Sequence, residues 1–325
     1  NKLKVNILKY LKSIIPISIG FACIYYSTTT LSQGDINSII QSFANAQYSW
    51  VFFGVVLGGL SHVSRSYRWK YLLKPLGYNI SFLNSVLAVF SGYLINYTIP
   101  RAGDVARGTI AYKYEQIPLE KGLGTIVAER AVDLLCITIL IIIGLFINYE
   151  LISEKLLEAS SFVNIKLLFL IAIILASILF FILRKKNNSI PIISKLQDFF
   201  KGLYEGFMII FKLENKWLFI FHSIFIWLMY VLMFLVTTKA VAELPDLSFP
   251  IILISFILAS LTIMFTPGGI GAYPLAVQIS FSWFGISSVS SLSFGWIMWT
   301  SQTLMIIIFG GLSLIILPFV NDKKP

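Results

Sequence analysis

The sequence predicts an all-α polytopic membrane protein with about six transmembrane helices and two oppositely oriented re-entrant hairpins that form an inverted repeat. Three observations lead to this fold class. Of the 325 residues, 57% are hydrophobic and 12% are charged, with a mean hydropathy of +0.84, whereas soluble domains are roughly 25% charged. Apolar runs near the roughly 20 residues that cross a bilayer recur along the whole chain. Two of these runs are interrupted by proline and glycine.

Length and apolarity place the full spans along the chain. They are expected at residues 14–31, 49–66, 124–148, 164–184, 217–238 and 290–317. No remaining stretch could form a separate soluble core, so residues 1–325 are expected to form a single integral membrane domain. The basic residues 1–12 resemble a secretory signal, but the apolar run after them is long enough to remain as a span. Cys23 and Cys136 lie within apolar runs and predict neither a disulfide framework nor a metal site.

The distribution of charge predicts the orientation of these spans. The loop at 150–158 contains the acidic residues Glu150, Glu154 and Glu158, whereas basic residues dominate 184–216. The first loop is therefore expected to be external and the second cytoplasmic. Both termini are then cytoplasmic, as expected for a multi-pass protein of the inner (plasma) membrane. Of the 25 lysines and arginines, this topology leaves outside only Lys155, Lys166 and Lys239. The net charge of +10 is therefore interpreted as an orientation signal and not as a nucleic-acid-binding surface.

The two interrupted stretches, residues 82–113 and 249–285, are predicted to be re-entrant hairpins. The first has cytoplasmic residues on both sides and therefore enters and leaves from the cytoplasm. The second has to enter and return from outside, which gives the pair the opposed orientation of an inverted repeat. Between the halves, apolar residues recur at helical spacing in 189–214 with charges among them, which predicts an amphipathic helix on the cytoplasmic interface.

The first break has the composition of an anion site. Pro100 interrupts the helix and Gly103 permits a turn, after which Asp104 is expected to cap a new helix. Free amides at a helix start attract anions, and Arg101 and Arg107 add full positive charges, so we expect a phosphate to bind here. The alternative is a cytoplasmic loop whose arginines only touch lipid head groups.

A second break follows in the other interrupted stretch. Its residues are Pro267, Gly268, Gly269 and Gly271, with Tyr273 beside them as a further candidate site residue. Unpaired backbone is costly in hydrocarbon, so this turn is expected to face protein or a wet cavity. A tight hairpin that serves only close helix packing is the alternative. The opposed pair of breaks favours a site near the membrane midplane, between broken helices.

Three charges, Glu129, Arg130 and Asp133, precede the apolar part of the third span. That part, residues 134–147, would be about 21 Å long as a helix against about 30 Å of hydrocarbon, which places the charges within or just below the cytoplasmic third of the membrane. Their spacing lets them pair with one another. A structural ion pair, retention of Arg101 or Arg107 by the carboxylates, and proton coupling all remain open.

Another basic cluster lies at the end of the second span. His62, Arg65 and Arg68 follow one another at three-residue spacing. We expect these side chains to snorkel to head groups, with a share in the site as the alternative.

At these motifs the chain resembles the family of the lysylphosphatidylglycerol synthase transmembrane region, also described as flippase-like. The resemblance covers nearly the whole chain and rests on Asn96, the run 100–107, Glu129-Arg130-x-x-Asp133 and the run 266–271. It implies movement of phospholipids, such as aminoacylated phosphatidylglycerol, between leaflets, or a role in polyprenyl-phosphate pathways. Many members carry a glutamate near the position of Pro274, and this chain has none there. The sequence ends at Pro325, so we expect the soluble aminoacyl-transfer domain of the bifunctional synthases to be absent.

Three functions are weighed against these features. The preferred hypothesis is a non-enzymatic transporter that moves an anionic lipid between leaflets, with the bilayer, that lipid and a separate lipid-modifying enzyme as expected partners. No cofactor, metal or nucleic acid is expected, and the oligomeric state is left open. The second hypothesis is an integral-membrane transferase with Asp104, Glu129 or Asp133 as base, although no nucleotide-binding glycine motif or catalytic triad accompanies them. The third, a scaffold for envelope lipid enzymes, would leave the charges within the membrane unexplained.

Overall fold

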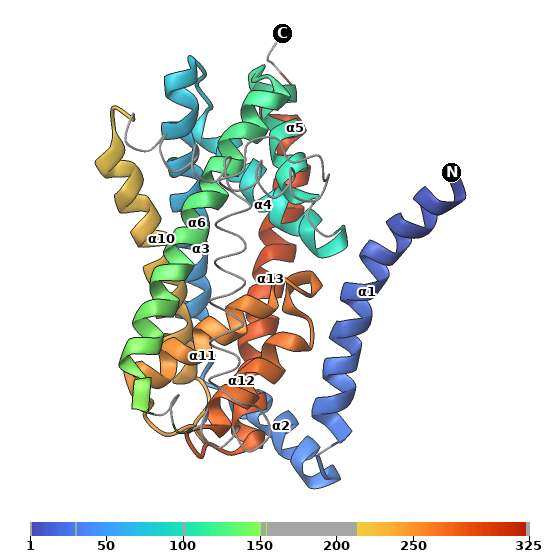
Figure 1. The fold of residues 1–325 in the computed structure, drawn as a ribbon, viewed down its shortest axis with the longest axis vertical. Coiled ribbons are helices and arrows are strands. Elements are labelled where there is room, and N and C mark those ends of the chain that lie inside the picture. The colour runs from blue at the N-terminus through green and yellow to red at the C-terminus, as the bar shows by residue number, and fades with distance from the viewer. Residues whose placement is uncertain (1, 30, 100–101, 151–153, 155–212, 323–325) are drawn as a thin grey trace, which may run out of the picture. The chain divides into compact units, whose positions relative to one another are not determined.

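The computed structural model describes residues 2–29, 31–99, 102–150, 154 and 213–322, and shows an all-α polytopic membrane protein (Figure 1). The described helices are α1 (Lys2–Thr29), α2 (Gln33–Asn45), α3 (Tyr48–Leu73), α4 (Phe82–Thr98), α5 (Gly103–Glu115), α6 (Leu119–Ile147), α10 (Lys216–Thr238), α11 (Phe249–Thr262), α12 (Ala272–Ser282) and α13 (Ser288–Asn321). Short 3-10 turns occupy η1 (Lys74–Leu76) and η2 (Pro267–Gly269). Of the described helices, α6, α10 and α13 are long and apolar enough to cross a membrane.

Five predicted spans coincide largely with helices, namely α1, α3, α6, α10 and α13. The span predicted at 164–184 lies outside the described residues, as do nearly all of the 150–158 loop and the amphipathic helix predicted at 189–214. The chain divides into two compact units, residues 1–126 with 213–325 and residues 127–212. Helix α6 begins in the first unit and continues into the second, and the first unit holds both breaks.

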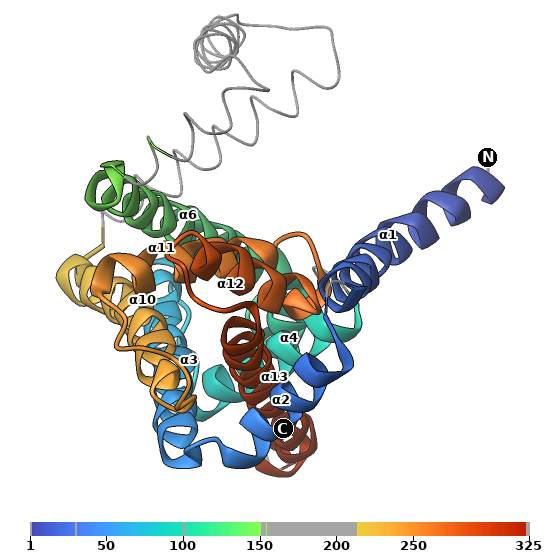
Figure 2. The same cartoon turned by 90° about the horizontal axis from the view of Figure 1, so that it is seen from below.

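Helices α3 and α10 form an antiparallel pair in the first unit, and both views show them side by side (Figures 1 and 2). The N–H of Gln47, just before α3, donates to the carbonyl oxygen of Ala240, just after α10, at 2.9 Å. Glycine permits the close approach, since a Cβ on Gly58 would lie 2.8 Å from the sulfur of Met233. This pair brings the polar end of α3 against the start of α10.

Helices α4 and α5 form a hairpin whose two ends lie together. The Glu115 carboxylate at the end of α5 accepts from the backbone N–H of Ser81 at 3.1 Å and from its hydroxyl at 2.5 Å. The same oxygen accepts from the side-chain amide of Asn84 at 2.6 Å. Asn84 also exchanges two hydrogen bonds with the amide of Asn321 at the end of α13, each 2.9 Å. Both ends of the first hairpin are therefore at the same end of the unit.

Helix α13 touches both hairpins and shows that they run in opposite directions. Near its start, Gly295 lies against Pro274 of α12, and further along, Gly310 lies against Leu94 of α4. At its last residue, Asn321 meets the base of the first hairpin. Gly295 and Asn321 are about 39 Å apart along the helix axis. The base of the first hairpin is thus at the end of α13, whereas α12 of the second hairpin packs on its beginning (Figure 1).

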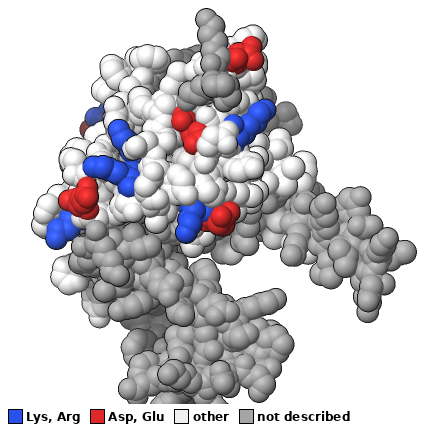
Figure 3. All heavy atoms as spheres, turned by 90° about the horizontal axis from the view of Figure 1, so that it is seen from above, with Lys and Arg blue, Asp and Glu red and all other residues white. Residues whose placement is uncertain are grey.

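The end of the unit at which α13 finishes carries exposed charges of both signs. Figure 3 views the protein from this end and shows blue basic and red acidic side chains among white ones. Lys74 and Glu214 form an exposed ion pair here at 3.4 Å. Such charges favour the water-facing end of a membrane protein.

Candidate functional site

The first break separates α4 from α5, and Asn96 closes it. The side-chain oxygen of Asn96 accepts from the backbone N–H of Gly103 at 2.7 Å. Ala102 is the N-cap residue and its side chain forms no cap, while Asp104 lies in the first turn of α5. Asp104 is therefore not the N-cap residue; Asn96 from the preceding helix binds one terminal amide, and Asp104 lies within the first turn. Pro100 and Arg101 lie outside the described residues, and the role of Arg101 stays a prediction.

Gly103 permits close packing of the hairpin and does not adopt a left-handed turn. It is the first residue of α5 and is not among the described glycines with positive φ. A Cβ on Gly103 would overlap the carbonyl oxygen of Gly92 and the side chain of Asn96. The two helices therefore touch backbone to backbone beside the break, a contact that only small residues allow.

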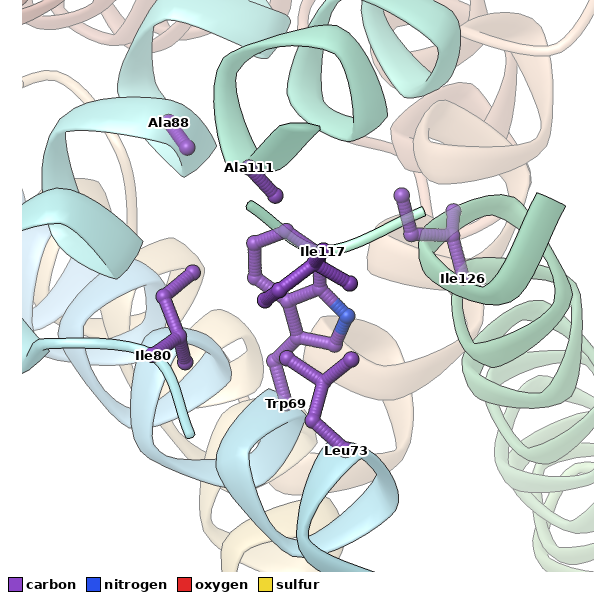
Figure 4. Packing of buried hydrophobic residues seen from close by; sticks show 7 residues of the cluster. All are labelled: Trp69, Leu73, Ile80, Ala88, Ala111, Ile117 and Ile126. Carbon is purple, nitrogen blue, oxygen red and sulfur yellow. The ribbon is translucent and has the colours of Figure 1, made fainter. Parts of the chain in front are cut away.

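Arg107 is held against the indole of Trp69. Its guanidinium carbon lies 3.8 Å from the centre of the Trp69 ring, and only 3% of Arg107 is exposed. The indole N–H donates to the hydroxyl of Thr125 at 2.9 Å, which fixes the orientation of the ring. Apolar residues pack around the indole from four helices and the connecting segments, as Figure 4 shows. They are Leu73, Ile80, Ala88, Ala111, Ile117 and Ile126. The Arg107 guanidinium thus stacks on an indole ring whose orientation is fixed.

The second break is a glycine turn held by α13. Gly268, Gly269 and Gly271 have φ values of 58°, 79° and 66°, which favour glycine. Pro267 begins the 3-10 turn, and the indole N–H of Trp299 donates to the carbonyl oxygen of Gly268 at 2.8 Å. An acceptor freed by the break is thereby satisfied within the protein.

The two breaks meet through Tyr97 of α4. A Cβ on Gly268 would overlap the Tyr97 ring, so the ring lies directly on the backbone of the second turn. Tyr273, at the start of α12, is 3% exposed and hydrogen-bonds with Gln302 of α13. Gly271 approaches the backbone of Gly20 in α1 in the same way. Aromatic rings and glycine backbone therefore join the tips of the two hairpins.

His62, Arg65 and Arg68 are buried and do not snorkel. Their exposed fractions are 5%, 3% and 0%. Arg68 donates to the hydroxyl of Ser223 on α10 at 3.2 Å, and its guanidinium lies 5.6 Å from the Phe219 ring. The prediction that these side chains extend to the head groups is wrong, because their face of α3 packs against neighbouring helices.

The charges of α6 include the internal ion pair that their spacing allows. Arg130 and Asp133 approach to 3.5 Å. Glu129 is 1% exposed and Asp133 is 8% exposed, so both carboxylates are withdrawn from solvent. Their predicted pairing with Arg101 or Arg107 stays a prediction.

The described residues hold no group of three or more histidines, cysteines or acids that could bind a metal ion. Comparison with known proteins then gives the family. The family described as the lysylphosphatidylglycerol synthase TM region matches residues 13–311. The chain belongs to this family. A UPF0104 membrane protein from Methanocaldococcus jannaschii is 28% identical over 197 residues, which is 59% of this chain and 55% of that relative. No solved structure matches the chain.

The recognition of the lysylphosphatidylglycerol synthase TM family from sequence is confirmed, but several residues of the site were missed. They are Trp69, Tyr93, Tyr230 and Trp299. Trp69 stands between Arg68 and Lys70, and the other three lie in apolar helices, where an aromatic side chain does not stand out from the core. One signal was available for Tyr93, because Tyr93 and Tyr97 are four residues apart and share a face of the helix that precedes the break. In this family member, that face meets both the polar part of α3 and the second turn.

Proposed function

We propose that this protein moves an anionic lipid, a phospholipid or a polyprenyl-phosphate-linked lipid, between membrane leaflets. The lipid phosphate binds at the first break, at Arg107 and the start of α5, with Arg101 as the second predicted cation. The membrane is the cell's inner (plasma) membrane, and both termini are cytoplasmic. Membership of a lipid-related membrane family supports a role in lipid handling.

The observation that carries this proposal is the stacking of Arg107 on Trp69. A guanidinium with one face on an indole presents its N–H groups in the plane of the group, which suits two oxygens of one phosphate. Holding a full charge at 3% exposure within a membrane protein is costly and is typical of functional residues. A structural role alone would be served by an apolar side chain of similar size.

The opposed hairpins support transport over lipid modification. Transporters with inverted repeats place the substrate between broken helices near the midplane, where the two halves can rock against each other. In this protein the tips of the hairpins meet at Tyr97 and Gly268, and their bases lie toward opposite ends of α13. We infer that the two hairpins act as the paired elements of such a repeat.

The test is leaflet exchange in proteoliposomes. Tail-labelled phosphatidylglycerol, a labelled polyprenyl phosphate and a zwitterionic phosphatidylcholine are compared for the parent protein and its variants. Arg107→Ala should slow exchange of the anionic lipids by at least about tenfold, because charge-assisted hydrogen bonds are worth about 1.5 to 3 kcal/mol. Arg107→Lys should recover the rate only in part, because lysine lacks the planar donor pair.

Lys113→Ala is the matched control, because Lys113 is an exposed cation on the same helix. It should leave the rate unchanged. Equal exchange of phosphatidylcholine and phosphatidylglycerol by the parent, with Arg107→Ala as active as the parent, would show that this break does not recognise phosphate.

A further inference from the structure

A second polar cluster lies in the core between α3, α4 and α10. The hydroxyl of Tyr230 hydrogen-bonds with the side chains of Ser61, Tyr93 and Arg65. Ser61 is 0% exposed and Arg65 is 3% exposed. We call Ser61, His62, Arg65, Tyr93 and Tyr230 the hydroxyl cluster. Tyr93 and Tyr230 are half-buried. A guanidinium as buried as that of Arg65 is unusual in a helical membrane core, where ionisable groups are commonly functional.

His62 gives an independent indication that the hydroxyl cluster receives a ligand. Its ring is 5% exposed and lies 4.4 Å from the Tyr93 ring and 6.2 Å from the Tyr230 ring, measured between centres. Within the described part of the chain, its Nδ1 has no hydrogen-bond partner. A buried nitrogen left without a partner costs about 1 to 3 kcal/mol, which a ligand atom would recover.

The hydroxyl cluster lies on helix faces that continue to both breaks. On α3, Arg65 and Trp69 are four residues apart and share a face, and the Trp69 ring stacks against the guanidinium of Arg107. On α4, Tyr93 and Tyr97 share a face in the same way, and Tyr97 packs on the second turn. Each step of four residues advances about 6 Å along a helix. The cluster therefore lies between the phosphate site at Arg107 and the joint of the hairpin tips.

We propose that the hydroxyl cluster is a second phosphate station, to which the phosphate passes from Arg107 on its way toward the hairpin tips. This inference rests on the proposed function and adds a second binding site to it. Arg65 supplies the charge, and Tyr93 and Tyr230 supply neutral donors, while the Ser61 hydroxyl donates to the carbonyl oxygen of Gly58 at 2.6 Å. Hydroxyls can donate to phosphate oxygens and also accept from one another once the phosphate has left. Such a station binds the charge without retaining it as strongly as several cations would.

The first experiment measures binding without transport. In detergent-solubilised full-length Arg107→Gln protein, dioctanoyl phosphatidic acid and inorganic phosphate are titrated by calorimetry. We expect the lipid to bind, and to lose at least about tenfold in affinity when Arg65→Gln is added, since hydrogen bonds to charged groups are worth about 1.5 to 3 kcal/mol. Binding of the lipid only identifies a lipid head group as the source of the phosphate, and binding of both ligands identifies phosphate itself.

The second experiment measures passage. Tyr230→Phe and Tyr93→Phe remove a hydroxyl and keep the ring, so they test the station even if Arg65→Gln does not fold. Each should slow exchange of tail-labelled phosphatidylglycerol several-fold while leaving the affinity at Arg107 within a factor of about two. Tyr112→Phe removes an exposed hydroxyl from α5 and should match the parent.

The two proposals fail in different ways. Loss of phosphate selectivity in the parent, or indifference to Arg107→Ala, contradicts the proposed function. Folded Tyr230→Phe and Tyr93→Phe proteins that exchange lipid as fast as the parent contradict the second station and leave Arg107 as the phosphate site. Failure of Arg107→Gln protein to bind either ligand contradicts the second station as well.

Discussion

The aromatic ring of Tyr97, one turn before the first break, lies directly on the backbone of Gly268 in the second break. This contact joins two segments that are separated by about half of the chain. The hairpins that carry them have their bases toward opposite ends of α13. Movement of one hairpin should displace the other through this contact, because the Tyr97 ring leaves no room for an added carbon atom on Gly268.

Gly268→Ala is therefore expected to destabilise the protein strongly. The added methyl group meets the Tyr97 ring, and a non-glycine residue at a φ of 58° costs about 1 to 2 kcal/mol before that clash is counted. Thermal unfolding in detergent measures the effect. Gly59→Ala is the control, because a Cβ there meets nothing within 4 Å. Equal melting temperatures for the two variants would contradict the packing described for the tips, and Tyr97→Leu should restore part of the loss in Gly268→Ala.

Asn96→Ala should destabilise the first hairpin by about 1 kcal/mol, the usual value of a helix cap, because the N–H of Gly103 loses its partner. Asn96→Asp keeps an acceptor and should lose less. Asp104→Asn removes a charge from the first turn, and the interaction of that charge with the helix dipole is worth about 0.3 to 1 kcal/mol. Chemical denaturation of the three variants tests this order. A larger loss for Asp104→Asn than for Asn96→Ala would return the capping role to Asp104.

Trp69 is expected to act on transport through the orientation of Arg107. Trp69→Phe keeps an aromatic face and loses the bond to Thr125, whereas Trp69→Leu loses both, so exchange rates should fall in that order. Thr125→Val separates the hydrogen bond from the stacking and should lower stability by about 1 kcal/mol. Stability and exchange are measured on the same preparations. If Trp69→Leu folds and exchanges lipid like the parent, the Trp69 ring has no part in the site.

The topology can be checked by labelling single cysteines after Cys23 and Cys136 have been replaced. Asn79→Cys and Lys113→Cys flank the first hairpin, and both residues are exposed. They should react with an impermeant reagent from one side, because the hydrogen bond between Ser81 and Glu115 holds both flanks together, and the distribution of charge predicts that this side is the cytoplasm. Asp246→Cys, beyond the far end of α10, should react from outside. Labelling of Asn79→Cys and Lys113→Cys from opposite sides would make the first hairpin a full crossing.

The sequence predicts most of what depends on local chemistry. Runs of apolar residues give the helix ranges, and proline followed by glycine places both breaks, because these residues restrict or widen the backbone angles wherever they occur. The family follows from the same motifs. That the first hairpin enters from the cytoplasm and the second from outside is predicted from charge, and it stays a prediction.

What the sequence does not predict depends on neighbours that are distant in the chain. Arg65 and Arg68 resemble snorkelling residues until α10 is packed against them. Asp104 has the chemistry of a cap, yet Asn96 takes that role because Gly92 and Gly103 bring the two helices together. Trp69 resembles any core aromatic residue until Arg107 is found on its face. Each of these roles is set by a contact between helices, which hydrophobic periodicity does not specify.

The base of the first hairpin is fastened to α13 by two neutral amides, those of Asn84 and Asn321. The bond between the two amides is not an ion pair, so high ionic strength acts on it weakly. The nearby pair of Lys74 and Glu214 is exposed and will be screened by salt. Washing the membrane with concentrated salt should thus weaken the ion pair of Lys74 and Glu214, while the hydrogen bonds between Asn84 and Asn321 of α13 persist.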